Sequence, residues 1–568
     1  MSVTDWIVLV VTLLTIVVYG IYKSRGNRNI DGYLLGNQSL PWYHVCLSVM
    51  ATQASAITFL SAPGLAYSSG MSFVQFYFGL PLAMIVLSIT FVPIFHRLKV
   101  YTAYEFLEKR FDLKTRALTA FLFLVQRGLS TGITIYAPSI ILSTILNIDT
   151  TYTTMFIGGL VIIYTVYGGT KAVSYTQLLQ MSIIFSGLFI AGVVVVSLLP
   201  GNVGFSDAIH IAGKMGRTNA IDFSFDWNNQ YTVWSGLIGG FFLQLSYFGT
   251  DQSQVGRYLT GASVGQSRLG LLMNGLVKIP MQFLILLIGI LVFAFYQFNQ
   301  PPIFFNSYEL NKLENSRYNK QLNDIKSDYA LAFKQKQTHV ENLEKAIESD
   351  DQASVFRERR QLKSADAEMK EIRKRAVDLM EKNDPEADTN DNNYIFLSFV
   401  TKYLPQGLIG LLIAIIFLAS MGSTASALNS LTSTTVVDIY KRLIHKNGSE
   451  SSYLNVSRWT TVIWGLFCIL MALYASKLGN LIEAVNILGS LFYGTILGIF
   501  IVAFYFKKIG GTATFKAAVL TEFIVCTVWW LDSVAFLWLN VIGCVLVVIM
   551  ASLFQKLETK KPAQVAQA

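Results

Sequence analysis

LASMGSTASALNS, residues 418–430, lies inside a long run of apolar residues. Hydroxyl and carboxamide groups nevertheless recur through it, at Ser420, Ser423, Thr424, Ser426, Asn429 and Ser430. Hydrocarbon offers such groups no hydrogen-bond partner. Polar residues inside membrane spans usually face the interior of a helix bundle and mark the path of a substrate or an ion. The stretch therefore predicts an all-α membrane protein with a polar path through it.

The composition of the whole chain agrees with this prediction. Of the 568 residues, 53% are hydrophobic and only 14% are charged, which does not fit a soluble globular protein. The net charge of +9 would suit a nucleic-acid binder, but the basic residues outside one central insert lie mostly at the ends of apolar segments. This placement indicates the lipid bilayer as a partner and predicts no nucleic-acid binding.

Apolar runs long enough to cross a bilayer predict about 13 transmembrane helices. They lie at residues 5–23, 43–68, 72–96, 117–146, 152–167, 176–199, 232–250, 269–297, 406–436, 455–475, 480–506, 513–531 and 534–554. The first run is followed at once by Lys23 and Arg25, whereas Asp5 stands where a signal peptide would carry basic residues. We therefore expect a retained span.

Basic residues in the short loops predict the orientation. Their clusters fall on alternate loops, at residues 23–28, 97–116, 171, 257–268, 441–446, 507–508 and 556–561. All of them are cytoplasmic if the N-terminus is outside and the tail, residues 556–568, is inside. The absence of loops rich in glycosylation sites and of a long tail favours the inner membrane of a bacterium.

Residues 299–393 differ from the rest, because they are dense in Lys, Glu, Asp and Gln and contain no Gly. The topology places this insert outside, in the periplasm of a bacterium. Segments 331–348 and 355–382 have helical composition with opposite charges at helical spacing, which predicts a hairpin standing off the membrane. The insert is either a lid or partner-binding domain, contacting an unknown partner, or a solvated insertion without a role in transport.

Nothing in the sequence predicts an enzyme. Phosphate-binding motifs of the G-x-G-x-x-G and P-loop types are absent, as is H-E-x-x-H. Only five histidines occur, and no two of them stand at a spacing suited to a metal.

Polar clusters interrupt three of the expected spans, at residues 50–58, 244–252 and 418–430. Gly, Ser, Thr and Pro at such points allow a helix to unwind, and freed carbonyls and hydroxyls can then bind a hard cation such as sodium. The alternative is close helix packing. Arg127 and Lys278 pose a related choice, because each is a charge within a span that either binds an anionic solute or reaches the membrane surface.

Several motifs make the chain similar to the sodium/solute symporter family, which includes sodium–glucose, sodium–iodide, proline and sialic acid transporters. These are YTVYGGTKAV at 164–173 with YTQ at 175–177, TDQ at 250–252 with Arg257, and NS at 429–430 leading to DIY at 438–440. The resemblance covers roughly residues 1–300 and 394–555. It implies a LeuT-type core of two inverted five-helix repeats, with one helix before it and two after it. The membrane blocks would then be residues 1–298 and 394–555.

The resemblance also implies a sodium site. In the family it uses carbonyls of the first core helix, here Ala51 and Ala54, and a carbonyl of the eighth core helix, here Ala419. Two adjacent hydroxyls complete it, and they fall on Gly422 and Ser423. Gly422 has no hydroxyl, so Ser420 or Thr424 either compensates or one ligand is lost.

A second sodium site of some family members needs an aspartate where this chain has Gln177 and a hydroxyl where it has Ala425. The expectation is therefore one sodium ion per transport cycle.

The residues expected to bind the solute combine the family's pocket with the polar clusters. They are Gln53, Ser55, Thr58, Tyr77, Arg127, Gln244, Tyr247, Lys278 and Glu483. Residues 132–138, GITIYAP, look closer to the anion-carrying branch of the family. We expect a sodium-coupled symporter of a sugar or related polar solute. The alternatives are a carrier of an organic anion, such as a monocarboxylate or sialic acid, and a transporter-like sensor or a channel.

Overall fold

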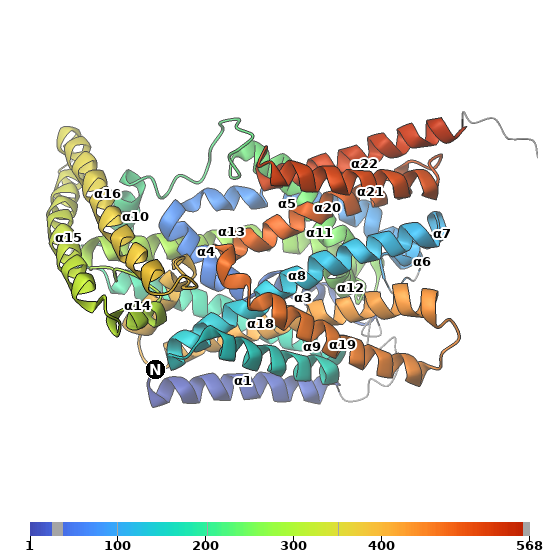
Figure 1. The fold of residues 1–568 in the computed structure, drawn as a ribbon, viewed down its shortest axis with the longest axis horizontal. Coiled ribbons are helices and arrows are strands. Elements are labelled where there is room, and N and C mark those ends of the chain that lie inside the picture. The colour runs from blue at the N-terminus through green and yellow to red at the C-terminus, as the bar shows by residue number, and fades with distance from the viewer. Residues whose placement is uncertain (25–37, 99, 101, 202, 350, 560–568) are drawn as a thin grey trace, which may run out of the picture.

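The computed structural model describes residues 1–24, 38–98, 100, 102–201, 203–349 and 351–559. Every regular element among these residues is a helix, and one isolated β-bridge joins Leu40 to Gly261. Figure 1 shows the long helices running side by side, with α1 (Val3–Ser24) along one edge and α22 (Phe536–Thr559) along the opposite edge. The all-α fold expected from the sequence is confirmed.

The first part of the bundle consists of elements from the N-terminus to the long helix α9. They are α1, α3 (Trp42–Gln53), α4 (Ala56–Ser69), η2 (Met71–Tyr77), α5 (Leu80–Val86), η3 (Leu87–Phe91), α6 (Val92–Leu98), α7 (Glu105–Arg110), α8 (Leu113–Leu146) and α9 (Thr150–Ser197).

The second part of the bundle consists of elements that precede and follow the insert along the chain. It begins with α10 (Phe205–Lys214), η4 (Ser235–Gly239), α11 (Gly240–Thr250), α12 (Gln252–Tyr258) and α13 (Val264–Phe298). After the insert come η5 (Asn392–Tyr394), α17 (Ile395–Tyr403), α18 (Leu408–Ser433), η6 (Thr434–Ile444), α19 (Glu450–Ala472), η7 (Ala475–Leu478), α20 (Leu481–Tyr505), α21 (Gly511–Trp530) and α22.

Nine helices of the described residues are long and apolar enough to cross a membrane, or ten if the bent pair α3 and α4 counts as one span. Two shorter apolar helices, Val3–Ile16 and Thr150–Ile163, add to them. Each of the runs identified in the sequence falls on helical residues, and the run at 232–250 corresponds to the short pair η4 and α11.

The runs at 152–167 and 176–199 lie within a single element, because α9 is helical over 48 residues. The sequence predicts a break between them, but no proline interrupts residues 164–175 and the backbone remains helical there. The side chains at 164 and 167–175, which include most of the YTVYGGTKAV motif and Lys171, lie outside the described residues, as do residues 25–28 and 560–568 of the basic clusters.

Two helices are interrupted near the middle of the bundle, at polar clusters that the sequence singles out. Ala54 and Ser55 have non-helical backbone angles between α3 and α4, which are bent by 63°. Asp251 separates α11 from α12 and caps α12 by accepting a hydrogen bond of 2.8 Å from the Ser253 amide. Each break leaves carbonyls without partners in their own helix.

Helix α18 carries the polar stretch 418–430 and contacts α3, α4, α8 and α9. Every residue of that stretch is buried except Met421, which is partly exposed. Its hydroxyls therefore face protein rather than lipid, as the sequence predicts.

The insert contains α14 (Ser307–Glu314) and two long helices, α15 (Asn319–Glu348) and α16 (Gln352–Asn383), that pack against each other. Eight of the nine buried residues of α16 alternate at spacings of three and four: Val355, Glu358, Leu362, Ala365, Met369, Ile372, Ala376 and Leu379; the ninth, Met380, adjoins the last of them. This is the heptad pattern of a coiled coil. Lys336 and Asp366 form an ion pair of 2.7 Å within it.

The coiled coil lies across one end of the bundle in Figure 1 instead of standing clear of it, in contrast to the expectation from the sequence. Helix α15 contacts α10 and α13. The reason is apolar burial, since Val340 and Leu343 form a small core against which Met215 and Phe298 pack.

Candidate functional site

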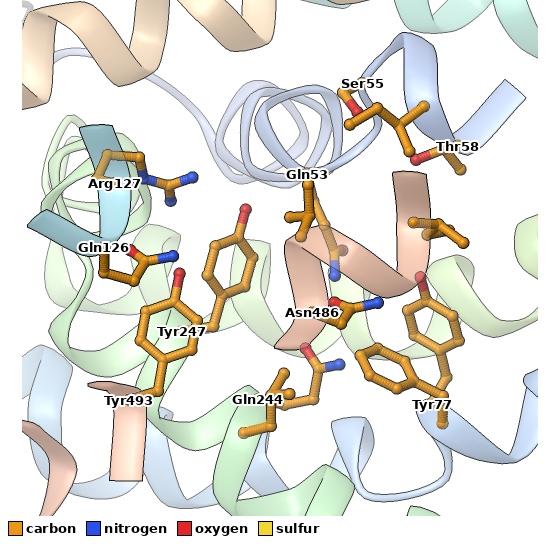
Figure 2. A pocket seen from close by; sticks show the side chains of 15 residues that line it. Gln53, Ser55, Thr58, Tyr77, Gln126, Arg127, Gln244, Tyr247, Asn486 and Tyr493 are labelled. Carbon is orange, nitrogen blue, oxygen red and sulfur yellow. The ribbon is translucent and has the colours of Figure 1, made fainter. Parts of the chain in front are cut away.

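A polar cavity of about 90 Å³ lies between the broken helices. One water molecule needs roughly 10–15 Å³ of such volume, so the cavity has room for several water molecules or part of a small solute. Its walls come from α3, α4, η2, α8, α11 and α20 (Figure 2). The lining residues are Gln53, Ser55, Ile57, Thr58, Phe76, Tyr77, Gln126, Arg127, Leu243, Gln244, Tyr247, Ile482, Val485, Asn486 and Tyr493.

Seven of the nine residues expected to bind the solute line this cavity: Gln53, Ser55, Thr58, Tyr77, Arg127, Gln244 and Tyr247. Three polar lining residues were not expected, namely Gln126, Asn486 and Tyr493. Gln126 stands next to Arg127, and Asn486 and Tyr493 are seven residues apart on α20, which places them on one face of that helix. This periodicity is the signal that identifies them.

The remaining two expected residues lie outside the lining. Lys278 is fully buried, with its ammonium nitrogen 5.8 Å from the centre of the Tyr77 ring. Glu483 accepts hydrogen bonds of 2.8 Å from the side chains of Gln230 and Tyr231. Asn486, three residues further along α20, occupies the cavity wall in its place.

Carboxamides dominate the polar wall of the cavity. Both amide atoms of Gln244 are buried without a hydrogen-bond partner among the described residues, and the same holds for the side-chain oxygens of Gln53 and Gln126. Figure 2 shows Gln53, Gln244 and Asn486 turned toward one another. Leaving a buried amide unsatisfied costs about 1–3 kcal/mol per group, so these groups are suited to a ligand that supplies both donors and acceptors.

Arg127 is held by an ion pair rather than reaching the membrane surface. Its guanidinium donates to the carboxylate of Asp251 and, over 2.6 Å, to the hydroxyl of Ser253. The Tyr493 hydroxyl donates to the same carboxylate over 2.9 Å. Asp251 is only 1% exposed, so the pair is buried and its two charges cancel at the cavity wall.

The residues expected to bind sodium lie beside the break in α3 and on the adjacent face of α18. Ala51 lies in the last turn of α3 and Ala54 directly follows that helix, where carbonyls lose their helical partners. On α18, the Ser423 hydroxyl donates to the Ser420 carbonyl over 3.1 Å, which leaves its oxygen lone pairs available. Thr424 is fully buried, and its hydroxyl has no hydrogen-bond partner within the described part of the chain.

Gly422, which lacks the hydroxyl that the resemblance calls for, faces α9. A Cβ placed on Gly422 would lie 2.9 Å from the side-chain oxygen of Gln180. A carboxamide oxygen therefore stands where the missing side chain would project. The Ser420 hydroxyl donates to the Thr134 carbonyl of α8 over 3.1 Å and, like that of Ser423, keeps its oxygen lone pairs available.

Gln177 is also bonded to α3. Its side-chain oxygen accepts from Ser48 over 2.7 Å, and its amide nitrogen donates to Thr52 over 3.3 Å. A carboxamide thus bridges two hydroxyls at the place where some members of the resembled family carry an aspartate. Ala425, fully buried on α18, adds no oxygen from its side chain.

Comparison with known proteins places this arrangement in a family. The model of the sodium:solute symporter family matches residues 33–306 and 384–520, which together form most of the chain and exclude most of the insert. The chain is 25% identical to the sodium/glucose cotransporter of Vibrio parahaemolyticus over 94% of its length and 88% of that protein. It is 24% identical to the sodium/sialic acid symporter NanT of Aliivibrio fischeri, over 97% and 92%.

A further relative, sodium-coupled monocarboxylate transporter 1 of Xenopus laevis, is 26% identical over 88% of this chain and 67% of its own. Among solved structures, the substrate-bound outward-open state of a Na⁺-coupled sialic acid symporter superimposes with a TM-score of 0.75 at 21% identity, covering 98% of both chains. That likeness supports the fold. The chain is a multi-pass membrane protein and a sodium-coupled transporter rather than an enzyme, and it belongs to the sodium:solute symporter family.

Proposed function

We propose that the protein imports a small uncharged polar solute, such as a sugar, together with one sodium ion. The observation that carries this proposal is the set of unpartnered carboxamides around the cavity, with Gln244 at its centre. A sugar presents hydroxyl groups that both donate and accept, which matches carboxamide walls. The relative named a sodium/glucose cotransporter supports this solute class.

The charge of the cavity also favours an uncharged solute. Because Arg127 is engaged with Asp251, a solute carboxylate would have to compete with a buried counterion that is already in place. Breaking such a pair is costly, since it leaves a charge buried without a partner.

An organic anion is the second candidate. Lys278 supports it, because its ammonium nitrogen has no hydrogen-bond partner among the residues described and lies behind Tyr77, which lines the cavity. The relatives named for monocarboxylate and sialic acid transport point the same way. In this case Tyr77 would move aside to let the anion reach the ammonium group.

The coupling sodium ion, in this proposal, binds between the break in α3 and helix α18. The carbonyls of Ala51, Ala54 and Ala419 and the hydroxyl of Ser423 supply oxygens, which are the ligands that hard cations prefer. Gln180 supplies the oxygen that Gly422 lacks, and the Thr424 hydroxyl oxygen is a further ligand. The bonds of Gln177 to Ser48 and Thr52 support a single ion, because they hold in place an uncharged carboxamide where a second site would need a carboxylate.

The driving force follows from this stoichiometry. One charge moving through 100 mV provides ~2.3 kcal/mol, and a tenfold sodium gradient adds ~1.4 kcal/mol. One sodium ion could therefore sustain a roughly 500-fold gradient of a neutral solute but only about a tenfold gradient of a monoanion, whose charge cancels that of sodium. Sodium must also bind the outward-facing and inward-facing states with different affinities, because otherwise it drives nothing.

The proposed topology places the N-terminus and the insert outside and the C-terminal tail in the cytoplasm, in a bacterial inner membrane. The basic loop clusters support it. An external insert would be free to contact a further partner.

Uptake into proteoliposomes tests the function. Radiolabelled glucose, sialic acid and lactate would be offered separately under an inward sodium gradient and, as control, an equal potassium gradient. The proposal expects sodium-stimulated accumulation of the uncharged solute, enhanced by an inside-negative potential. Electroneutral accumulation of lactate would favour the second candidate, and no sodium-stimulated accumulation of any probe would contradict the proposal.

A further inference from the structure

The segment that leads out of the insert crosses the bundle on the insert side of the polar cavity, which is called the solute cavity from here on. Residues 384–394, here called the cover, follow α16 and include η5. They contact α4 at Gly64, where an added Cβ would lie 2.0 Å from the Asn392 carbonyl oxygen. They also reach the start of α20, since the side-chain amide of Asn393 donates to the Gly479 carbonyl over 3.1 Å.

Asp388 joins the cover to α8. Its carboxylate accepts hydrogen bonds from the Tyr394 hydroxyl at 3.1 Å and from the Tyr136 hydroxyl of α8 at 3.5 Å. Tyr136 belongs to the stretch 132–138, yet its hydroxyl is bonded to the cover and it does not line the solute cavity. The other oxygen of Asp388 accepts from the Asn390 amide at 3.2 Å.

These contacts fall on α4 and α8 and just before α20, three helices that line the solute cavity, and all of them lie nearer to the insert than the cavity does. Tyr136 is nine residues beyond Arg127 on α8, which is ~14 Å at 1.5 Å per residue. Gly64 is six residues beyond Thr58 on α4, and Gly479 precedes the first turn of α20. The cover therefore spans the insert-side end of the path between those helices.

We propose that Asp388 fastens the cover to α8 at the insert-side end of the solute path, and that it does so more firmly as the pH falls. The part of this proposal that concerns transport rests on the proposed function. Opening toward the insert side then requires the Tyr136–Asp388 contact to break, which gives the insert a part in the transport cycle.

The surroundings of Asp388 determine the direction of the pH effect. The pKa of Asp388 is raised to about 7, mainly by burial, and the neighbouring carboxylates of Glu309 on α14 and Asp391 in the cover act in the same direction. Hydrogen bonds from Tyr394 and the Asn390 amide act in the opposite direction. The charges of the neighbours are partly balanced, because Lys312 pairs with Glu309 and Arg373 pairs with Asp391.

Released into water, the carboxyl would return to an ordinary pKa of about 3.9. The fastened state therefore holds the proton more tightly than the released state, so acidification favours fastening and a rise in pH through 7 favours release. With these two values, the ratio of fastened to released cover changes by about tenfold between pH 8 and pH 6. A cavity of about 400 Å³, lined by Asp388, its neighbours 385–390, Lys477 and Gly479, provides room for the movement.

The test uses the full-length protein in lipid nanodiscs, with spin labels on cysteines at Thr389 of the cover and Tyr474 beside η7. The partly exposed Cys526 would be replaced by serine, while Cys46, Cys468 and Cys544 are buried. Pulsed electron–electron double resonance would give the distance between the two labels in the fastened state and in the released state, and the population of each state. The proposal expects two populations whose ratio changes about tenfold between pH 6 and pH 8.

Three variants separate the roles of the groups. Asp388→Asn cannot ionise and should abolish the pH response, whereas Tyr136→Phe should raise the released population while the response remains. Glu386→Gln, which alters an exposed acid of the same segment paired with Lys477, is the matched control and should keep the response. One population at both pH values in the unmodified chain, or an intact response in Asp388→Asn, would overturn the proposal.

The distance measurement between the spin labels needs no transported solute. A negative uptake assay would therefore count against the proposed function and not against the cover, and unchanged distances would leave sodium-coupled uptake standing. If Asp388→Asn does not fold, Tyr136→Phe still decides the matter, because an unaltered ratio of populations in it contradicts fastening through α8.

Discussion

Arg127 and Asp251 form a buried ion pair between α8 and the break that separates α11 from α12. The pair joins one continuous helix to one interrupted helix at the wall of the solute cavity. It removes the free positive charge that an isolated arginine would give to that wall, and this supports the proposal of an uncharged solute.

Replacing Asp251 tests how much that ion pair contributes to the stability of the fold. In Asp251→Asn the guanidinium of Arg127 stays buried without a counterion, which we expect to cost about 3–5 kcal/mol of stability. Thermal unfolding of the purified protein measures the loss. Glu386→Gln removes an exposed partner of Lys477 and should leave the melting temperature unchanged. Equal melting temperatures for Asp251→Asn and the unmodified chain would show that the pair is not buried as described.

Gln244 is expected to bind the solute directly. Both of its amide atoms are buried without partners among the described residues, so Gln244→Ala should not destabilise the empty protein. The apparent affinity for the transported solute should fall by roughly 5- to 150-fold, the equivalent of about 1–3 kcal/mol. The measurement is the dependence of sodium-driven uptake on solute concentration.

Gln297→Ala serves as the control for Gln244. This residue is equally buried but bonds to the Phe293 carbonyl of its own helix and lies outside the cavity. Its solute affinity should be unchanged. A comparable loss of affinity in both variants would mean that Gln244 acts on the fold and not on the solute.

Gln180 and Ser423 are expected to supply oxygens to the sodium ion. Gln180→Ala and Ser423→Ala should each weaken the sodium dependence of uptake by about tenfold or more, because each removes a polar ligand of a charge. Ser182→Ala, two residues along α9 and bonded only to its own helix, should have no effect. In the Gln180→Ala background, Gly422→Ser should restore sodium affinity. If it does not, Gln180 does not supply the oxygen that Gly422 lacks.

The one-sodium prediction is open to a gain-of-function test. The double variant Gln177→Asp, Ala425→Ser introduces the carboxylate and the hydroxyl that the chain lacks. We expect the Hill coefficient for sodium-driven uptake to rise from about one toward two. A coefficient near two in the unmodified chain would show that a second ion already binds.

The sequence alone predicts the polar interior of this protein well, because hydrocarbon tolerates no unpaired polar group. That constraint points directly to the breaks at Ala54 and Asp251 and to the buried face of α18. Seven residues of the cavity wall follow from the same reasoning together with the family resemblance.

Features that depend on how helices are rotated against each other could not be predicted. Glu483 and Asn486 differ by less than one turn of α20, and only packing decides that Asn486 lines the cavity while Glu483 bonds to Gln230. Gln180 is recognisable as a neighbour of Gly422 only after α9 and α18 are docked. The coiled coil shows its heptad spacing in sequence, but its position across the bundle depends on Val340 and Leu343 meeting Phe298.

The central claim, one sodium ion transported with an uncharged solute, is tested most directly by the voltage that balances a solute gradient. In proteoliposomes with equal sodium on both sides and the potential set by potassium and valinomycin, the flux of the transported solute is measured against a tenfold solute gradient. The account predicts zero net flux at about 59 mV, the value for one charge per solute. Balance at about 30 mV would indicate two charges, and no dependence on voltage would indicate an anion moving with sodium; either result would contradict the account.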